Sequence, residues 1–175
     1  MASESEEDGI RRKAIETELR RLEQSARDSS QAQFEETKHW RGVNLSLGLP
    51  ASLLAAASGA TALAATAGRI TAGFLAIAAA GFGAVLTTVN ASHHMNQASS
   101  AANAYLEIQT AARQAREIDL PYITVDDARQ ILAEITARRD EQNKTADPPS
   151  KRSYKKAQAN IKSGGQTYDV DSAKG

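Results

Sequence analysis

Hydrophobic and polar positions divide this chain into a central apolar zone and two charged flanks. Across residues 42–106 the only Asp, Glu, Lys or Arg is Arg69, whereas the segments on either side are dense in all four. A helix of about 20 residues, at 1.5 Å rise per residue, crosses the roughly 30 Å hydrocarbon core of a bilayer. The pattern predicts an all-α membrane protein with a two-helix transmembrane hairpin over 42–89, whose helices cover about 43–66 and 70–89 and whose tip is Arg69.

Insertion of these helices is only weakly favourable. Seven strongly apolar residues fall in the first helix and eight in the second. At roughly 0.3 to 0.6 kcal/mol each, either helix gains about 2 to 5 kcal/mol. One charge near a helix centre costs about 2.5 to 3.5 kcal/mol and removes most of that gain. The absence of charge therefore decides the prediction, and we expect the two helices to insert as a pair.

The alternative is a water-soluble bundle whose two central helices are buried packing elements rich in Ala and Gly. The rest of the chain would then have to wrap both helices completely. Those segments are too polar to supply more than thin amphipathic stripes. We therefore favour the membrane interpretation.

The N-terminal flank combines an acidic tail with an amphipathic helix. Residues 1–9 are acidic and Ser-rich, and we expect them to be disordered. Residues 10–41 carry apolar residues at spacings of four and three, which predicts a cytoplasmic amphipathic helix with a narrow seam of Ile15, Leu19, Leu22 and Ala26. The seam either packs on the chain's own C-terminal helices or forms a self-associating coiled coil, and its short length favours the first.

A membrane interface is expected where this flank meets the apolar zone. Lys38, Trp40 and Arg41 place an indole between cations beside an apolar run, which is typical of the headgroup level. The basic flank favours a cytoplasmic location, and two crossings return the chain to the same side, so both termini are expected in the cytoplasm. His93 and His94 are adjacent and cannot form the i, i+4 pair of a zinc site.

Small residues recur at every fourth position of the hairpin. Such stripes let helix backbones approach closely and favour helix association in lipid. Pro50 is expected to mark where the first helix begins. The hydroxyl residues of the hairpin either line an aqueous path or bond the backbone of their own helices. The candidate packing residues are Gly48, Ser52, Ala56, Ala60, Ala72, Ala76, Ala80 and Ala84.

Residues 90–147 are expected to form cytoplasmic helices. A helix from Asn90 should end before Pro121, and Thr124 caps a new helix with Asp127 in the capping-box position. The expected apolar face of this second helix consists of Val125, Ala128, Leu132 and Ile135.

Residues 148–175 are expected to form a Pro-linked basic helix and a tail. The helix from Ser150 to Ser163 contains no acidic residue. Its cations are candidate contacts for an anionic lipid headgroup or a phosphate-bearing ligand, and the alternative is a solvated surface. These candidates are Lys151, Arg152, Lys155 and Lys156.

Composition excludes several kinds of chemistry. The chain has no cysteine, so disulfides and thiolate sites are ruled out. Gly-rich phosphate loops, metal-ligand spacings and nucleophile elbows are absent from the sequence, which predicts a protein that is not an enzyme and has no catalytic, cofactor or metal residues. Few aromatic residues accompany the basic segment, so nucleic-acid binding is not expected. The net charge of zero hides the segregation of charge along the chain.

The order of these parts resembles the SLATT family of bacterial two-transmembrane effectors. The resemblance covers roughly residues 10–171 and includes KHWRGVN, LGLPASLLAAASGATALA, ITAGFLAIAAAGFGAVLTTVN, ASHHMNQASSAANAY and RRDEQNK. The most specific parts are the Trp40, Gly48 and Pro50 pattern, the exit at Asn90, and the terminal block within PPSKRSYKKAQANIKSGGQTYDVD. None of these is a catalytic motif.

The resemblance implies an effector of a bacterial anti-phage or conflict system in the inner membrane. A separate sensor or nucleotide-synthesising partner would trigger a homo-oligomer to permeabilise or depolarise that membrane. The alternative function is a membrane anchor that forms no pore and serves as a scaffold for a cytoplasmic partner.

Overall fold

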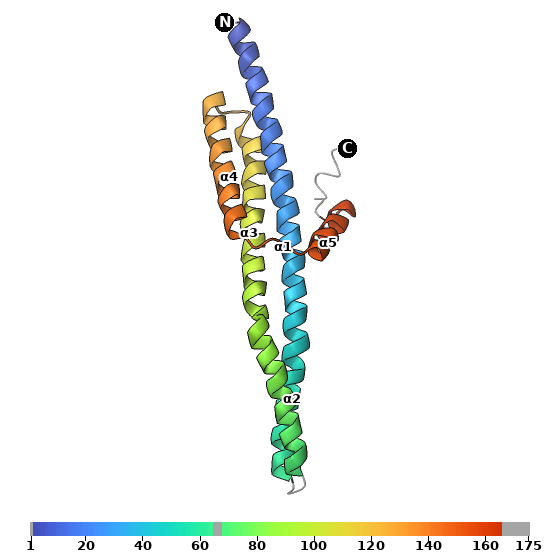
Figure 1. The fold of residues 1–175 in the computed structure, drawn as a ribbon. Coiled ribbons are helices and arrows are strands. Elements are labelled where there is room, and N and C mark those ends of the chain that lie inside the picture. Colours follow the sequence, from blue (N-terminus) through green and yellow to red (C-terminus); the bar gives the residue numbers. More distant parts are fainter. Residues whose placement is uncertain (1, 65–67, 166–175) are drawn as a thin grey trace. The chain divides into compact units, whose positions relative to one another are not determined.

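A computed structural model describes residues 2–64 and 68–165, and for residues 2–5, 62–64 and 68–69 it describes the backbone alone (Figure 1). This part of the chain is helical and contains no β-strand. Two of its helical stretches are long and apolar enough to span a membrane. The elements are α1 (Ala2–Ala64), α2 (Gly68–Val89), α3 (Ala91–Gln114), the π-helix η1 (Ala115–Asp119), α4 (Val125–Thr145) and α5 (Lys151–Lys162).

The chain divides into two compact units. The first, here called the bundle unit, contains the residues up to Glu36 and those from Gln97 onward. The second, here called the apolar unit, is Thr37–Asn96.

The core of the bundle unit lies between α1, α3 and α4, which run side by side in Figure 1. The predicted seam of α1 is buried throughout, and so is the predicted apolar face of α4. The α1 seam therefore packs on the chain's own helices, which confirms the first of the two alternatives for this helix. The core consists of Ile15, Leu19, Leu22, Ala26, Ala101, Tyr105, Ile108, Ala112, Ala115, Leu120, Val125, Ala128, Leu132 and Ile135.

Polar contacts, one buried and one partly buried, join α1 to α3 and η1. The Ser30 hydroxyl donates to the Ala102 carbonyl at 3.0 Å, and the Arg116 guanidinium donates to the Glu23 carboxylate at 2.8 Å. Burial alone would lower the pKa of Arg116, but hydrogen bonds and opposite charge from Glu23 and Glu117 outweigh it and raise that pKa. Arg116 therefore stays charged and holds η1 against α1.

The turn into α4 forms as the sequence predicts. Thr124 is the N-cap of α4, and its hydroxyl oxygen accepts from the Asp127 N–H at 3.1 Å. The preceding helix ends before Pro121, but its last turn is the π-helix η1 instead of a regular α-helical turn. In a π-helix each N–H bonds five residues back, and the Leu120 N–H reaches the Ala115 carbonyl in this way at 2.9 Å.

α5 is capped and packed at both ends. The Ser150 hydroxyl accepts from the Ser153 N–H, and Gly164 with φ 85° follows the C-cap, as expected for a glycine stop. Its buried side chains are Ser153 and Ala157. The Ser150 N–H donates to the Glu36 carboxylate at 2.9 Å, and Asn160 donates to Gln31 at 3.1 Å, so α5 lies on α1.

Two expectations for α1 are wrong. The acidic residues 1–9 were expected to form a disordered tail, but α1 begins at Ala2; Ala and Glu are good helix formers, and acidic side chains favour a helix N-terminus. Pro50 was expected to begin a helix, but it lies inside α1. Proline costs one N–H bond, here to the Ser46 carbonyl, while its fixed φ remains compatible with a helix. α1 therefore continues through residues 41 and 42 without a break in the helix.

Candidate functional site

In the apolar unit, contacts join the last part of α1 to α2 and to the first residues of α3. Residues further along α1 contact residues that come earlier in α2 and α3. The Trp40 ring stacks on the His94 ring with centroids 4.6 Å apart, and the Ser92 hydroxyl donates to the Asn44 side-chain oxygen at 3.2 Å. At the other end, the Ser58 hydroxyl donates across to the Ala72 carbonyl at 2.8 Å.

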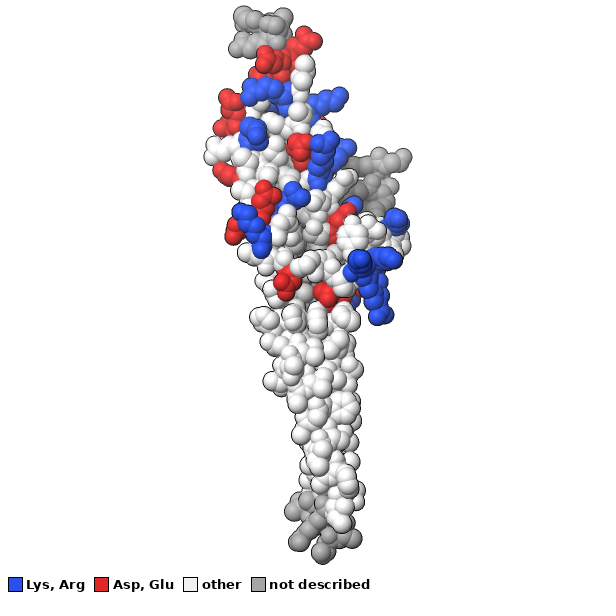
Figure 2. Space-filling model, viewed as in Figure 1, with Lys and Arg blue, Asp and Glu red and all other residues white. Residues whose placement is uncertain are grey.

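Large apolar side chains of this helix pair point away from the partner helix. Their exposed fractions lie between 37% and 74%. Figure 2 shows a white, uncharged surface over much of the molecule, where blue and red atoms are absent from the face in view. A contiguous apolar surface of this extent is unusual for a water-exposed protein and marks contact with a membrane or another protein. These side chains are Leu45, Leu49, Leu53, Ile70, Phe74, Ile77, Phe82 and Val85.

The candidate small-residue stripes mostly lie outside the contact between the two helices. Gly48 faces α2, because a Cβ atom there would lie 3.7 Å from the Leu86 Cδ2 atom, and Ala72 is buried. The remaining stripe residues are exposed: Ser52, Ala56, Ala60, Ala76, Ala80 and Ala84. Within one chain, the packing positions between these helices include larger residues such as Leu54 and Leu75, which are half-buried.

Most hydroxyl groups of the apolar unit bond the backbone of their own helix. Ser52 donates to the Gly48 carbonyl at 2.9 Å and Thr61 to the Ala57 carbonyl at 2.9 Å. Thr87 and Thr88 do the same in α2, at 2.9 and 2.8 Å. The Ser58 hydroxyl is an exception, because it donates to the Ala72 carbonyl of the other helix. Back-bonding of this kind satisfies a hydroxyl in an apolar environment without a water molecule.

The expected membrane interface contains a cluster of rings. Trp40 also contacts His39, with centroids 5.6 Å apart, and His93 lies edge-on to His94 at 5.9 Å. Lys38 and Arg41 are exposed beside this cluster. Arg69, the expected hairpin tip, lies outside the residues whose side chains the structure describes.

Asn90 separates α2 from α3. Its φ of 49° lies in the left-handed region, which Asn adopts more readily than most residues. The Asn90 N–H still bonds the Leu86 carbonyl at 3.0 Å, and its own carbonyl accepts from the His93 N–H at 3.0 Å. The exit position singled out in the sequence is therefore a break of one residue between two helices.

A cavity of about 720 Å³ lies beside α5 in the bundle unit. We call it the α5 groove. Its floor is formed by the buried residues Ala32, Gln33 and Tyr105. The Tyr105 hydroxyl donates to the Asn143 side-chain oxygen at 2.8 Å, and the Gln33 amide donates to the Asp147 carbonyl at 2.7 Å. The other lining residues are Ser29, Ala146, Pro148, Pro149, Lys151, Tyr154 and Lys155.

The four candidate anion-contacting cations divide between two sides of α5. All four are exposed. Lys151 and Lys155 line the α5 groove, whereas Arg152 and Lys156 do not. Burial raises the pKa of the Tyr105 phenol in the floor, against the lowering effect of the Arg139 charge, so this phenol remains a proton donor at neutral pH.

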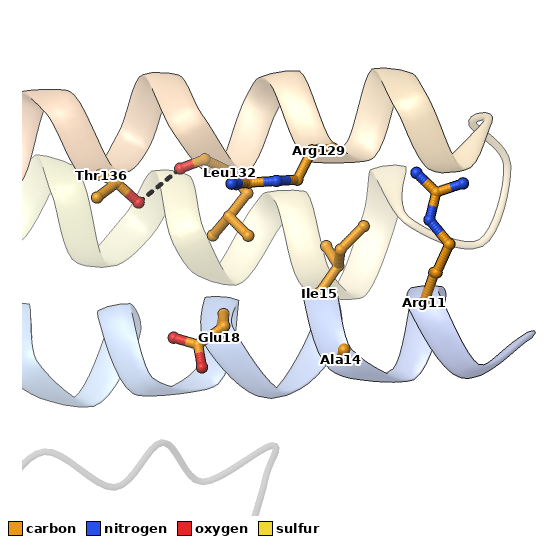
Figure 3. Close-up of a pocket in the computed structure, with 7 residues that line it drawn as sticks. All are labelled: Arg11, Ala14, Ile15, Glu18, Arg129, Leu132 and Thr136. Carbon is orange, nitrogen blue, oxygen red and sulfur yellow. Dashed lines mark hydrogen bonds between the residues drawn. The ribbon is translucent and has the colours of Figure 1, made fainter. Parts of the chain in front are cut away.

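A second groove, between α1 and α4, has a different character (Figure 3). Its volume is about 500 Å³, and its base is the core pair Ile15 and Leu132. Arg11 at its end is already paired with the Asp126 carboxylate at 3.2 Å. The Thr136 hydroxyl bonds the Leu132 carbonyl of its own helix at 2.7 Å. Glu18 is paired with Arg21 on its own helix. This groove is therefore a shallow depression between two packed helices, and Arg11, Glu18 and Thr136 in its lining already have protein partners.

Sequence reasoning found the cations of α5 but missed the groove beside them. Tyr105, Gln33 and Asn143 come from three different helices, and only the helix register of the folded bundle brings them together. The Gln33 position continues the apolar seam of α1 with a polar side chain, which is the one signal present in the sequence. Among the described residues, no group of three or more His, Asp or Glu is placed to hold a metal ion.

Comparison with known proteins gives no further assignment: no protein-family model, curated protein or solved structure matches this chain.

Proposed function

We propose that this chain is a two-span membrane effector of a bacterial anti-phage or conflict system. In this proposal the last part of α1 and the whole of α2 cross the inner membrane as a hairpin, and both termini face the cytoplasm. The exposed apolar surface of the helix pair carries the proposal, because it includes Leu53, Phe74 and Ile77 at 70%, 71% and 71% exposure. In water these side chains have nothing to pack against, whereas lipid chains would cover them.

Permeabilisation would require several copies. Two helices cannot enclose a path for ions, so an oligomer must supply the remaining walls. The exposed stripe residues, such as Ala60 and Ala76, are available to helices of other copies, because they are not used in the contact between α1 and α2. Close approach of small residues favours helix association in lipid. A separate sensor or nucleotide-synthesising protein, as the SLATT resemblance implies, would trigger the assembly.

The stripe contact is tested by substituting Leu for Ala60 or Ala76. We expect each substitution to weaken membrane depolarisation in cells that also express the activating partner, measured with a potential-sensitive dye. Matched controls are Ala55→Leu and Ala78→Leu, which add the same side chain at exposed alanines of the same helices away from the stripes. Equal depolarisation by the stripe variants, the controls and the unaltered protein would exclude the stripe as an oligomer contact.

A membrane anchor without a pore is the second candidate. It is favoured by the hydroxyl groups of Ser52, Thr61, Thr87 and Thr88, which bond the backbone of their own helices and are therefore not free to line a path for ions. Purified oligomer in dye-loaded liposomes separates the two functions. A pore-forming effector releases the dye, whereas an anchor leaves the vesicles sealed.

A further inference from the structure

The α5 groove has the dimensions and partial enclosure of a small-molecule site. Its volume of about 720 Å³ falls within the range of roughly 300 to 1,000 Å³ that such sites usually have. α1, α3, α4, the Pro148–Pro149 link and α5 each contribute to its walls. The buried floor is fixed by the hydrogen bonds of Tyr105 to Asn143 and of Gln33 to the Asp147 carbonyl. The cavity is therefore preformed by the fold of the bundle unit.

Two lysines and one carboxylate, Asp147, line the groove, so its charged side chains are mainly positive. Lys151 and Lys155 are four residues apart on α5 and so lie on the same side of the helix, where like charges repel each other. In the part of the chain that the structure describes, no carboxylate forms an ion pair with either ammonium group. An anion between the two side chains would relieve this repulsion. Phosphate suits such a site because lysine ammonium groups bind it as point charges.

The remaining lining groups suit an organic substituent on that phosphate. Tyr154 lies between the two lysines in sequence, is 47% exposed, and offers a ring face on which a planar or apolar group can lie. Asn143, whose side-chain oxygen accepts from Tyr105, also has an amide NH₂ group that can donate to hydroxyl oxygens. An inorganic phosphate ion alone would leave these groups and most of the volume unused.

We propose that the α5 groove binds a small phosphate ester, with its phosphate between Lys151 and Lys155 and its organic part against Tyr154. Two sources supply this chemistry: a soluble metabolite such as a nucleotide, and the headgroup of an anionic phospholipid. The inference concerns the bundle unit and does not depend on whether the apolar unit forms a pore.

The test is a calorimetric titration of the full chain in neutral detergent. Adenosine diphosphate is the soluble probe, and adenosine is its counterpart without phosphate. We expect saturable binding of adenosine diphosphate that is at least tenfold tighter than binding of adenosine. The double variant K151E/K155E should weaken this binding at least tenfold.

The matched control is R152E/K156E. This double variant makes the same change of net charge on the same helix, but at two residues that do not line the groove. We expect it to change the affinity less than twofold. If charge reversal disturbs α5, the neutral variant K151Q/K155Q and the variant Tyr154→Ala test the same site without adding negative charge. The melting curve of each variant shows whether the bundle unit remains folded.

A parallel titration with short-chain phosphatidylglycerol distinguishes the two sources. The probe that binds more tightly identifies the source of the phosphate. The site is supported if that probe loses its affinity in K151E/K155E but not in R152E/K156E. The proposal is overturned if neither probe binds saturably, if adenosine binds as tightly as its diphosphate, or if the two double variants lose affinity equally.

Discussion

The substitution Ile77→Arg tests whether α2 lies in a bilayer or in water. Ile77 lies near the middle of α2 and is 71% exposed. An arginine at the centre of a membrane-spanning helix costs about 2.5 to 3.5 kcal/mol, and removing the isoleucine forfeits roughly 0.3 to 0.6 kcal/mol more, a total of about 3 to 4 kcal/mol. The apolar residues of α2 together gain only about 2 to 5 kcal/mol, so one substitution removes most of the insertion free energy.

In water the same substitution would have almost no effect. Exposed positions away from special features usually change the free energy of unfolding by less than about 0.5 kcal/mol. A loss of 3 kcal/mol in the membrane instead lowers the ratio of inserted to non-inserted chain on the order of 100-fold. The two environments therefore give outcomes that a fractionation experiment can distinguish.

The assay compares Ile77→Arg with Ile118→Arg. Ile118 is also exposed, at 58%, but it belongs to η1 in the bundle unit. We expect Ile118→Arg to remain with the membrane fraction and Ile77→Arg to move to the soluble fraction or to be degraded. Equal membrane retention of the two variants would refute the assignment of α2 to the bilayer.

Three further predictions concern the bundle unit, each measured by chemical unfolding. Leu19→Ala should lower the free energy of unfolding by about 2 to 5 kcal/mol, because Leu19 is 1% exposed in the core and its truncation leaves a cavity. Glu23→Gln should lower it by about 1 to 2 kcal/mol, because the largely buried Arg116 loses a charged partner at 2.8 Å. Thr124→Ala should lower it by about 1 kcal/mol, because the Asp127 N–H loses its cap.

The controls for these predictions use exposed positions of the same elements. Glu16 pairs with Arg20 at 3.5 Å with both side chains about half exposed, so Glu16→Gln should cost less than about 0.5 kcal/mol. If Glu23→Gln is equally mild, the Arg116 contact does not hold η1 against α1. A Leu19→Ala variant with unchanged stability would contradict the packing of α1 on α3 and α4.

Local patterns predicted the bundle unit well. The seam from Ile15 to Ala26, the cap at Thr124 and the basic helix from Ser150 each depend on residues close together in sequence, and the structure contains all three. The boundaries within α1 were not predictable in the same way. An acidic start and Pro50 both resemble helix breaks locally, but a helix propagates across such positions once its neighbouring turns are formed.

Features that depend on which helices meet were beyond local patterns. The periodicity of small residues is the same whether a stripe faces the partner helix or faces outward, so Ala60 and Ala76 could not be placed from sequence. The α5 groove combines residues more than 100 positions apart, such as Gln33 and Lys151. The register between α1, α3 and α4 determines their proximity, and single-sequence periodicity does not specify that register.

The most direct test of the membrane assignment uses the absence of cysteine from the chain. Single cysteines at Leu53, Ile77 and Ile10 would occupy positions that are 70%, 71% and 67% exposed, so all three are equally open when no lipid is present. Their reaction with a water-soluble maleimide is then measured in sealed membranes and again after detergent extraction. We predict that in membranes the cysteine at Ile10 reacts and those at Leu53 and Ile77 do not. Equally fast labelling of all three in intact membranes would contradict the bilayer assignment.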